Sequence, residues 1–438
     1  VITVDKHNSI CEAIAIKNNK IVYIGDNYEV EKWHDNNTKV IDLNGRALLP
    51  GFIDSHMHLG MTGQNAAVII DCNSNNVSTI KDIQEKIHQA ALKTPKGSWI
   101  KATGYEQSKL AEGRHPTRDD LDEAAPDHPV QLTRCCLHMG VYNTLALKAG
   151  GITGPEMFSP GEVVIDENGR MTGLLKETAC TYMWDKVIYT KEEYMRSFKA
   201  ANDILLSYGI TSMHDGSFYG EETIGLYQEA CEKGLIKVRM YNLLYHAYGK
   251  TKTIEWINKF IATGIKGGLG NEAFRLGHVK ILIDGSTSGP SCATTKPYSH
   301  NPHLKGIQLY TQEESDDIII KAHNAGFNVS AHAVGDAAVN VILTSIERAM
   351  DQNPRPCRHR IEHCGIIDEN LLKRIKKAGI VPVPNPGFFN ENAEIYIKYY
   401  GDRVNYMFPL KSYIDNDIIA ALGSDSPVIN ANPMIGIY

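Results

Sequence analysis

The chain has 438 residues, of which 42% are hydrophobic and 22% charged, so it is long enough for one large barrel with an accessory module. The net charge of -6 and the absence of a long apolar run give no reason to expect a nucleic acid or a membrane as partner. Nine cysteines without regular spacing favour a reducing, cytoplasmic location over a disulfide framework.

The N-terminal residues 1–47 predict β-strands of a small β-sandwich. Four apolar runs are expected to form its strands: 1–4, 13–16, 21–25 and 39–43. The Asn18-Asn19 pair separates two of these runs and predicts a hairpin turn. We assign the remaining residues, 48–438, to a barrel domain.

The stretch from Leu49 to His58 predicts an apolar strand that carries His56 and His58 at its end. Alternate strand residues point to one face, so both imidazoles can project together. Two neutral imidazoles side by side are half of a zinc-type site. Two packed or surface histidines in an ordinary strand are the alternative.

The next stretch, about residues 60–190, mixes helix-like and strand-like segments. A connection of this length is expected to be a folded insertion and not a loop.

From about residue 191 onward, amphipathic helices alternate with short apolar strands. The expected strands are 210–214, 238–246, 275–284, 328–332, 358–363, 380–384 and 418–424. With the strand that ends at His58 they number eight, which predicts an α/β fold of the (β/α)8 TIM-barrel type.

Ionisable residues fall at the carboxyl ends of the expected barrel strands, where barrel enzymes place their chemistry. Besides the first two histidines they are Lys280, His332, His363 and Asp425. Each has a structural alternative; for example, His363 could bond Glu362 within the core. Their joint placement favours a functional site.

Lys280 lies in the apolar run His278–Ile283, where an unpaired ammonium is costly. It could extend to solvent, pair with Asp284, lose its proton, or react with CO2 to give a carbamate that bridges two metal ions.

These motifs resemble the amidohydrolase superfamily, and within it the YtcJ-like metal-dependent hydrolases of amidohydrolase family 3, which include N-substituted formamide deformylases. The resemblance rests on Pro50–His58, Val279–Ser286, His332–Asp336, Arg360–His363 and Leu422–Val428, with Arg134, His138 and Asn143 in the insertion.

The resemblance implies two divalent metal ions, with zinc expected, and hydrolysis of a non-peptide carbon–nitrogen bond in a small-molecule substrate. His56, His58 and Asp425 would hold one ion, His332 and His363 the other, and carboxylated Lys280 would bridge them. A metal-bridging hydroxide would attack the carbonyl carbon, with Asp425 as general base and then acid. A homodimer is compatible with the resemblance.

The chain departs from the family at Ala337, where an Arg usually follows Gly-Asp. It also stops at Tyr438, so we expect a sandwich that is incomplete at the C-terminus.

Arg134, His138 and His214 are weaker candidates for substrate contacts, and a structural role suits each of them equally. Residues 285–306 and 385–401 are expected to form lids over the site. The tyrosines at 396, 399 and 400 lie in the second of these segments.

Three other functions stay open. A mononuclear deaminase of the same superfamily typically has a Glu three residues after the strand-five histidine, where this chain has Gly335. An ester or lactone hydrolase would need the same site. A catalytically inactive barrel could serve as a binding protein.

Overall fold

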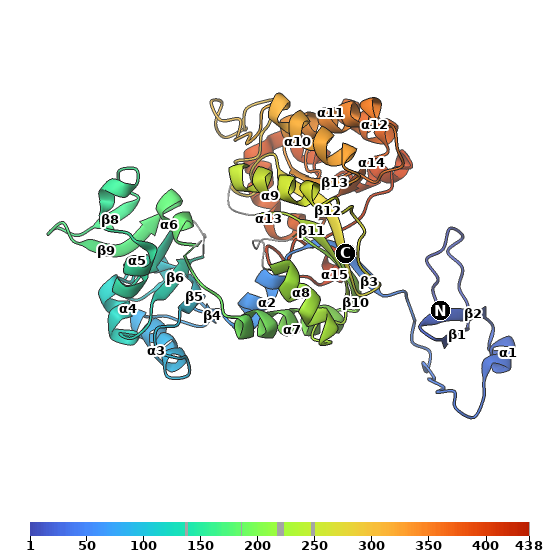
Figure 1. The fold of residues 1–438 in the computed structure, drawn as a ribbon, viewed down its shortest axis with the longest axis horizontal. Helices are drawn as coiled ribbons and strands as arrows, with labels where there is room; N and C mark the ends of the chain where they lie inside the picture. The colour runs from blue at the N-terminus through green and yellow to red at the C-terminus, as the bar shows by residue number, and fades with distance from the viewer. Residues whose placement is uncertain (136–138, 185, 217–222, 247–249, 438) are drawn as a thin grey trace.

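The computed structural model describes residues 1–135, 139–184, 186–216, 223–246 and 250–437. A barrel of strands and helices lies in the middle of the molecule, with the insertion on one side and the N-terminal segment on the other (Figure 1). No helix within these ranges is long and apolar enough to cross a membrane.

The barrel sheet contains seven parallel strands in the order β15-β14-β13-β12-β11-β10-β3. Their bounds are β3 (Phe52–Met57), β10 (Ile210–Asp215), β11 (Arg239–Leu244), β12 (Phe274–Leu282), β13 (Val329–Ala333), β14 (Arg360–His363) and β15 (Val381–Val383). All seven overlap strands expected from the sequence, because β-branched and aliphatic runs buried on both faces suit a parallel sheet.

The expected eighth strand, 418–424, is not a regular β-strand, which corrects that expectation. Its backbone nevertheless lies between the two edges of the sheet. The N–H of Ala421 donates to the carbonyl of Pro382 in β15 (3.0 Å), and the N–H of Ser55 in β3 donates to the carbonyl of Leu422 (2.9 Å). Positive φ angles at Asp417 (49°) and Asp425 (60°) interrupt extended geometry at both ends.

Helices cover the outside of the barrel sheet (Figure 1). They are α2 (Leu59–Ala67), α7 (Lys191–Ser207), α8 (Thr223–Glu232), α9 (Lys250–Ala262), α10 (Gln312–Asn324), α11 (Asp336–Gln352), α12 (Glu369–Ala378), α13 (Phe388–Tyr400), the 3-10 helix η4 (Gly401–Tyr406), α14 (Leu410–Asp415) and α15 (Pro433–Ile437). Capping boxes start two of them: Thr190 with Glu193 and Thr311 with Glu314. The apolar faces of α2, α7 to α12 and α14 form one large buried cluster with the strands. The buried aromatic residues of α13 belong to a separate cluster.

Helices α2 and α7 touch at Gly63. A Cβ on Gly63 would lie 1.8 Å from the backbone oxygen of Ser197, so only glycine allows this approach.

Residues 70–184 form a second sheet of six strands, in the order β4-β5-β6-β7-β9-β8. Its strands are β4 (Ile70–Asp71), β5 (Ile100–Tyr105), β6 (Val130–Arg134), β7 (Met139–Tyr142), β8 (Val163–Ile165) and β9 (Met171–Lys176). Its helices are α3 (Ile80–Ala91), η2 (Gln107–Lys109), α4 (Arg118–Ala124), α5 (Thr144–Gly150), η3 (Pro155–Met157) and α6 (Glu177–Trp184). It has apolar clusters of its own. The buried ammonium of Lys101 in β5 bonds Glu193 in α7 at 2.7 and 2.8 Å, which joins this sheet to the barrel.

The N-terminal segment contains the hairpin of β1 (Ala13–Lys17) and β2 (Lys20–Gly25), followed by α1 (Asn27–Val30) and η1 (Glu31–Trp33). Asn18 and Asn19 both have positive φ (51° and 59°), as the predicted tight turn requires. The expected strands 1–4 and 39–43 are not regular strands in the structure. Only an isolated bridge joins Ile2 to Ile10, and no neighbouring strand in the described residues pairs with 39–43.

Candidate metal centre

Three buried ligand-type side chains meet at the carboxyl end of the barrel strands. His56 lies in β3, His58 is the first residue after β3, and Asp425 follows the segment that closes the barrel. Asp425 Oδ1 is 3.1 Å from His58 Nε2 and 3.4 Å from His56 Nε2. One ligand atom from each residue lies within 4.8 Å of the other two, so the group can hold a metal ion.

The Asp425 Oδ1 atom accepts no well-aligned hydrogen bond from any described residue, although it is buried and faces two imidazole nitrogens. A buried carboxylate oxygen in that position is costly unless a cation completes it. The residues present therefore fit a divalent ion.

Lys280, from β12, reaches the same point. Its Nζ lies 3.2 Å from His56 Nε2. A Cβ on Gly216, at the end of β10, would lie 3.1 Å from this Nζ and 2.5 Å from His58 Cε1. The glycine backbone therefore lets both side chains approach the site. Asp284, one partner considered for Lys280, instead accepts the backbone N–H groups of Ala293, Val334 and Gly335.

His332 and His363 are the next two histidines along the strand ends, and their ring centroids are 4.5 Å apart. His363 also lies 5.0 Å from the His56 ring. His363 Nδ1 contacts Asn385 Oδ1 at 2.7 Å, and His332 Nε2 faces the carbonyl of Gly285 at 3.0 Å. His363 has φ +64°, which ends the regular alternation of β14.

Burial governs the charges at this centre. It lowers the pKa of His58 to about 4 and of His363 to about 4, against the opposing pull of Asp425. Burial also lowers the pKa of Lys280 to about 8, although Glu362 and Asp425 oppose it. Neutral imidazoles are the form that binds a metal, and a readily deprotonated lysine is the form that reacts with CO2.

Two charges remain. Burial would raise the pKa of Asp425, but the imidazoles of His56 and His58 hold it well below its usual value. For His56, burial and Lys280 lower the pKa, yet Glu362 and Asp425 raise it overall. A metal ion would therefore compete with a proton for His56.

The family model described as the amidohydrolase family matches residues 39–438. The protein belongs to the amidohydrolase family. The match includes all seven barrel strands and the closing segment, so the resemblance expected from the sequence is confirmed.

Relatives and solved structures agree with this. The chain of this amidohydrolase is 29% identical to the putative amidohydrolase YtcJ of Bacillus subtilis, over 93% of its own length and 75% of that protein. It is 27% identical to the N-substituted formamide deformylase of Arthrobacter pascens, over 98% and 80%. An uncharacterised metal-dependent hydrolase from Pyrococcus furiosus superposes with a TM-score of 0.81 at 26% identity, over 97% and 83%.

A second group of metal-ligand type lies at the opposite end of the strands: His323, Cys357 and His359. The imidazole nitrogens of His323 and His359 already take part in hydrogen bonds. The N–H of Val329 donates to His359 Nδ1 (2.9 Å), which places the His359 proton on Nε2, against His323 Nδ1 (2.9 Å). His323 Nε2 then donates to the carbonyl of Asn353 (2.8 Å). His359 has no lone pair left for a metal, so this group serves the fold.

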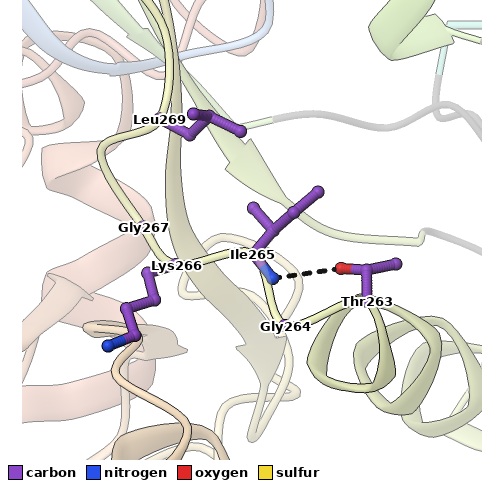
Figure 2. A pocket seen from close by; sticks show the side chains of 6 residues that line it. All are labelled: Thr263, Gly264, Ile265, Lys266, Gly267 and Leu269. Carbon is purple, nitrogen blue, oxygen red and sulfur yellow. Dashed lines mark hydrogen bonds between the residues drawn. The ribbon is translucent and has the colours of Figure 1, made fainter.

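Two surface cavities of about 390 Å³ each also lie away from the metal centre. One is lined by residues 263–267 and Leu269, in the loop that precedes β12 (Figure 2). The N–H of Ile265 donates to Thr263 Oγ1 at 3.3 Å and shapes its rim. The other cavity is nearby and shares Leu269. Both lie at the amino ends of the strands and contain no predicted site residue.

Two of the weaker candidates for substrate contacts, Arg134 and His214, lie in different sheets. Arg134, at the end of β6, donates to Gln107 Oε1 at 2.8 Å within the insertion. His214, in β10, contacts Arg360 and packs against Tyr241, with ring centroids 4.7 Å apart. His138 lies outside the described residues. Their roles in substrate binding stay predictions.

The two expected lids are tied to each other. Thr287 Oγ1 contacts Tyr396 OH at 3.0 Å, and Tyr400 OH donates to the carbonyl of Thr287 at 2.8 Å. Cys292 Sγ lies 3.2 Å from Tyr400 OH. The second segment is helical over α13, which the sequence analysis did not predict.

Sequence reasoning missed the partner of Glu362. This carboxylate does not bond His363; its Oε2 lies 2.5 Å from His56 Nδ1. The available signal was the pair Arg360 and Glu362, whose side chains point to the same inward face of β14. A buried ion pair in a strand next to a candidate metal ligand is costly and therefore indicates a structural or functional role.

Proposed function

We propose that this amidohydrolase is a metal-dependent enzyme that hydrolyses an amide-type, non-peptide carbon–nitrogen bond in a small molecule. The observation that carries the proposal is the convergence of His56, His58 and Asp425 on one buried point, with Lys280 Nζ 3.2 Å from His56 Nε2. The formamide deformylase among the relatives supports substrates of the N-formyl amine type.

Two ions are proposed, with zinc the first metal to test. His56, His58 and Asp425 would hold one, and His332 and His363 the other. Lys280, once carboxylated, would reach both. When bound, such ions supply a water of lowered pKa and polarise the substrate carbonyl.

The chain's own residues then move the proton. Asp425 is an ionised carboxylate at the site, so it can take the proton of the attacking water and pass it to the leaving nitrogen. His363 is braced by Asn385 and His332 by the Gly285 carbonyl, so both rings are held in place. Transfer to nitrogen makes the amine a neutral leaving group.

A site with a single ion is the competing proposal. It is favoured by one observation, that His56, His58 and Asp425 alone already form a compact three-ligand group. It leaves Lys280 without a role in the chemistry. The same ligands could also serve ester or lactone hydrolysis.

We also propose that the enzyme acts in the cytoplasm. The nine cysteines without regular spacing support this location, because they do not form the pattern of a disulfide framework.

The test is metal content and activity measured together. Elemental mass spectrometry on protein purified without chelator or nickel affinity should find about two ions per chain, the number in bridged sites of this kind. Activity is then assayed on N-formyl amines, simple amides and cyclic ureas, with matched esters beside them. One ion per chain would favour the mononuclear site. A chain that stays metal-free after incubation with zinc and bicarbonate would overturn the proposal.

A further inference from the structure

A buried carboxylate inside the barrel contacts one of the candidate metal ligands, on the side of its ring away from Asp425. Glu362 is fully buried in β14, and its Oε2 lies 2.5 Å from Nδ1 of His56 in β3. These two strands are not neighbours in the sheet, so the contact crosses the barrel interior. It meets the ring nitrogen of His56 that faces away from Asp425.

Three donors hold the Glu362 carboxylate in place. Arg360 donates from Nε to Oε1 (2.6 Å) and from Nη2 to Oε2 (2.7 Å), and Ser330 Oγ donates to Oε1 (2.7 Å). Arg360 Nη2 also donates to the carbonyl of Ser55, the residue before His56, at 2.6 Å. A guanidinium fork that grips both oxygens fixes the carboxylate plane.

This arrangement sets the position of the proton on His56. A carboxylate that receives these donors can only accept, so the hydrogen of the imidazole lies on Nδ1. The lone pair is then on Nε2, which faces Asp425 Oδ1 (3.4 Å) and Lys280 Nζ (3.2 Å). That is the tautomer a metal ligand needs.

At His363 and His332 the closest hydrogen-bond acceptor is a neutral group. His363 Nδ1 contacts the amide oxygen of Asn385, and His332 Nε2 contacts the carbonyl of Gly285. Asp284 Oδ1 lies 3.5 Å from His332 Nε2, farther than the Gly285 carbonyl, so among these three rings only His56 has a carboxylate as its closest acceptor. A charged acceptor makes the opposite nitrogen a stronger donor to a metal than a neutral acceptor does.

We propose that Glu362, fixed by Arg360 and Ser330, is the positioning residue that orients His56 and strengthens metal binding at the centre. The inference rests on the proposed function, because it requires a metal ion at His56. Glu362 does not touch substrate; it acts through His56.

The test is the variant Glu362→Gln. Arg360 needs an acceptor, so the amide oxygen would turn to Arg360 and the NH2 group to His56 Nδ1, which favours the tautomer with hydrogen on Nε2. Zinc affinity of the metal-stripped full chain, measured by competition with a chromophoric chelator, should fall about 10- to 100-fold. In histidine-labelled protein, 15N NMR should show the His56 proton moving from Nδ1 to Nε2.

A matched control and a milder variant separate this role from a general loss of structure. Glu347 and Arg374 form a comparable two-contact pair between α11 and α12 on the outside of the barrel (3.0 and 2.6 Å). Glu347→Gln should leave zinc affinity unchanged. Glu362→Asp keeps the charge but shortens the reach to His56, so its zinc affinity should fall below that of the wild type and of Glu347→Gln. This comparison tests the role of Glu362 even if the Gln variant does not fold.

The outcomes distinguish the two levels of the proposal. If the wild type binds zinc and Glu362→Gln binds it equally tightly with the tautomer unchanged, the role of Glu362 is overturned while the metal centre stands. If the wild type binds no zinc, the metal centre fails and this assignment fails with it.

Discussion

Asp425 Oδ1 lies 3.1 Å from His58 Nε2, and the two backbones beside these side chains are bonded to each other. The N–H of Asp425 donates to the carbonyl of His56 (2.7 Å), and the N–H of His58 donates to the carbonyl of Ser426 (2.8 Å). The first and last strand positions of the barrel therefore align the ligands before any ion binds. A ligand set that is organised in advance loses little entropy on binding.

The first prediction concerns Asp425→Asn. The amide has the same size but cannot take a proton, so the hydrolysis rate should fall about 10²- to 10⁴-fold. Zinc content should fall as well, because one anionic ligand is lost. Rates on an N-formyl amine and elemental analysis check both effects. Asp351→Asn, at an exposed position at the end of α11, is the control, and equal activity of the two variants would contradict the prediction.

Lys280→Met provides the second prediction. Methionine fills the buried space of the stem but cannot form a carbamate, so the number of ions per chain should drop from about two to about one. Metal analysis with and without added bicarbonate gives the answer. A variant that keeps the wild-type metal content would show that Lys280 does not bridge ions.

That the proposed metal ligands lie close together could be predicted from sequence, because it depends on local rules. Alternation along a strand brings His56 and His58 together, and barrel geometry collects residues from strand ends. The partner of Glu362 could not be predicted in this way. Its contact with His56 crosses the barrel, and only the relative register of non-adjacent strands determines which inward side chains meet.

Other features of the fold could not be predicted from sequence for similar reasons. The segment 418–424 has the composition of a strand, but tertiary bonds to β3 and β15 hold it in irregular geometry. Residues 39–43 also have strand-like composition, yet a strand is stable only with a partner. The order of the six strands in 70–184 depends on long-range pairing that the hydrophobic pattern does not specify.

The third prediction tests the contact between α2 and α7. Gly63→Ala would place a methyl group against the Ser197 carbonyl, so the free energy of unfolding should fall by about 1–3 kcal/mol through overpacking. Gly225→Ala is the matched control, because its Cβ would meet no atom within 4 Å in α8. That substitution should stabilise the chain by up to about 1 kcal/mol. Chemical denaturation of both variants decides, and equal effects would contradict the structure.

The fourth prediction concerns acid stability. Burial lowers the pKa of His359 to about 3, and His323 and Arg355 add to the effect. In the unfolded chain its pKa is about 6.5. As the pH falls from 6.5 towards 3, the unfolded state binds a proton that the folded state refuses, so stability decreases.

At pH 5 the loss due to His359 alone is on the order of 2 kcal/mol relative to pH 7. Urea denaturation of metal-free wild type and His359→Gln at both pH values measures it. The wild type should lose more stability than the variant by about that amount. Identical losses would show that His359 is not held neutral.

The chain leaves the barrel at the end of α2 and returns at the start of α7, two helices in contact at Gly63. The second sheet therefore attaches at a narrow base, and its apolar clusters are separate from that of the barrel. Evolution can exchange or reshape such a module without moving a single ligand of the proposed metal centre. The same hydrolytic chemistry could thus be offered to different substrates by changing only the part of the chain that does not perform it.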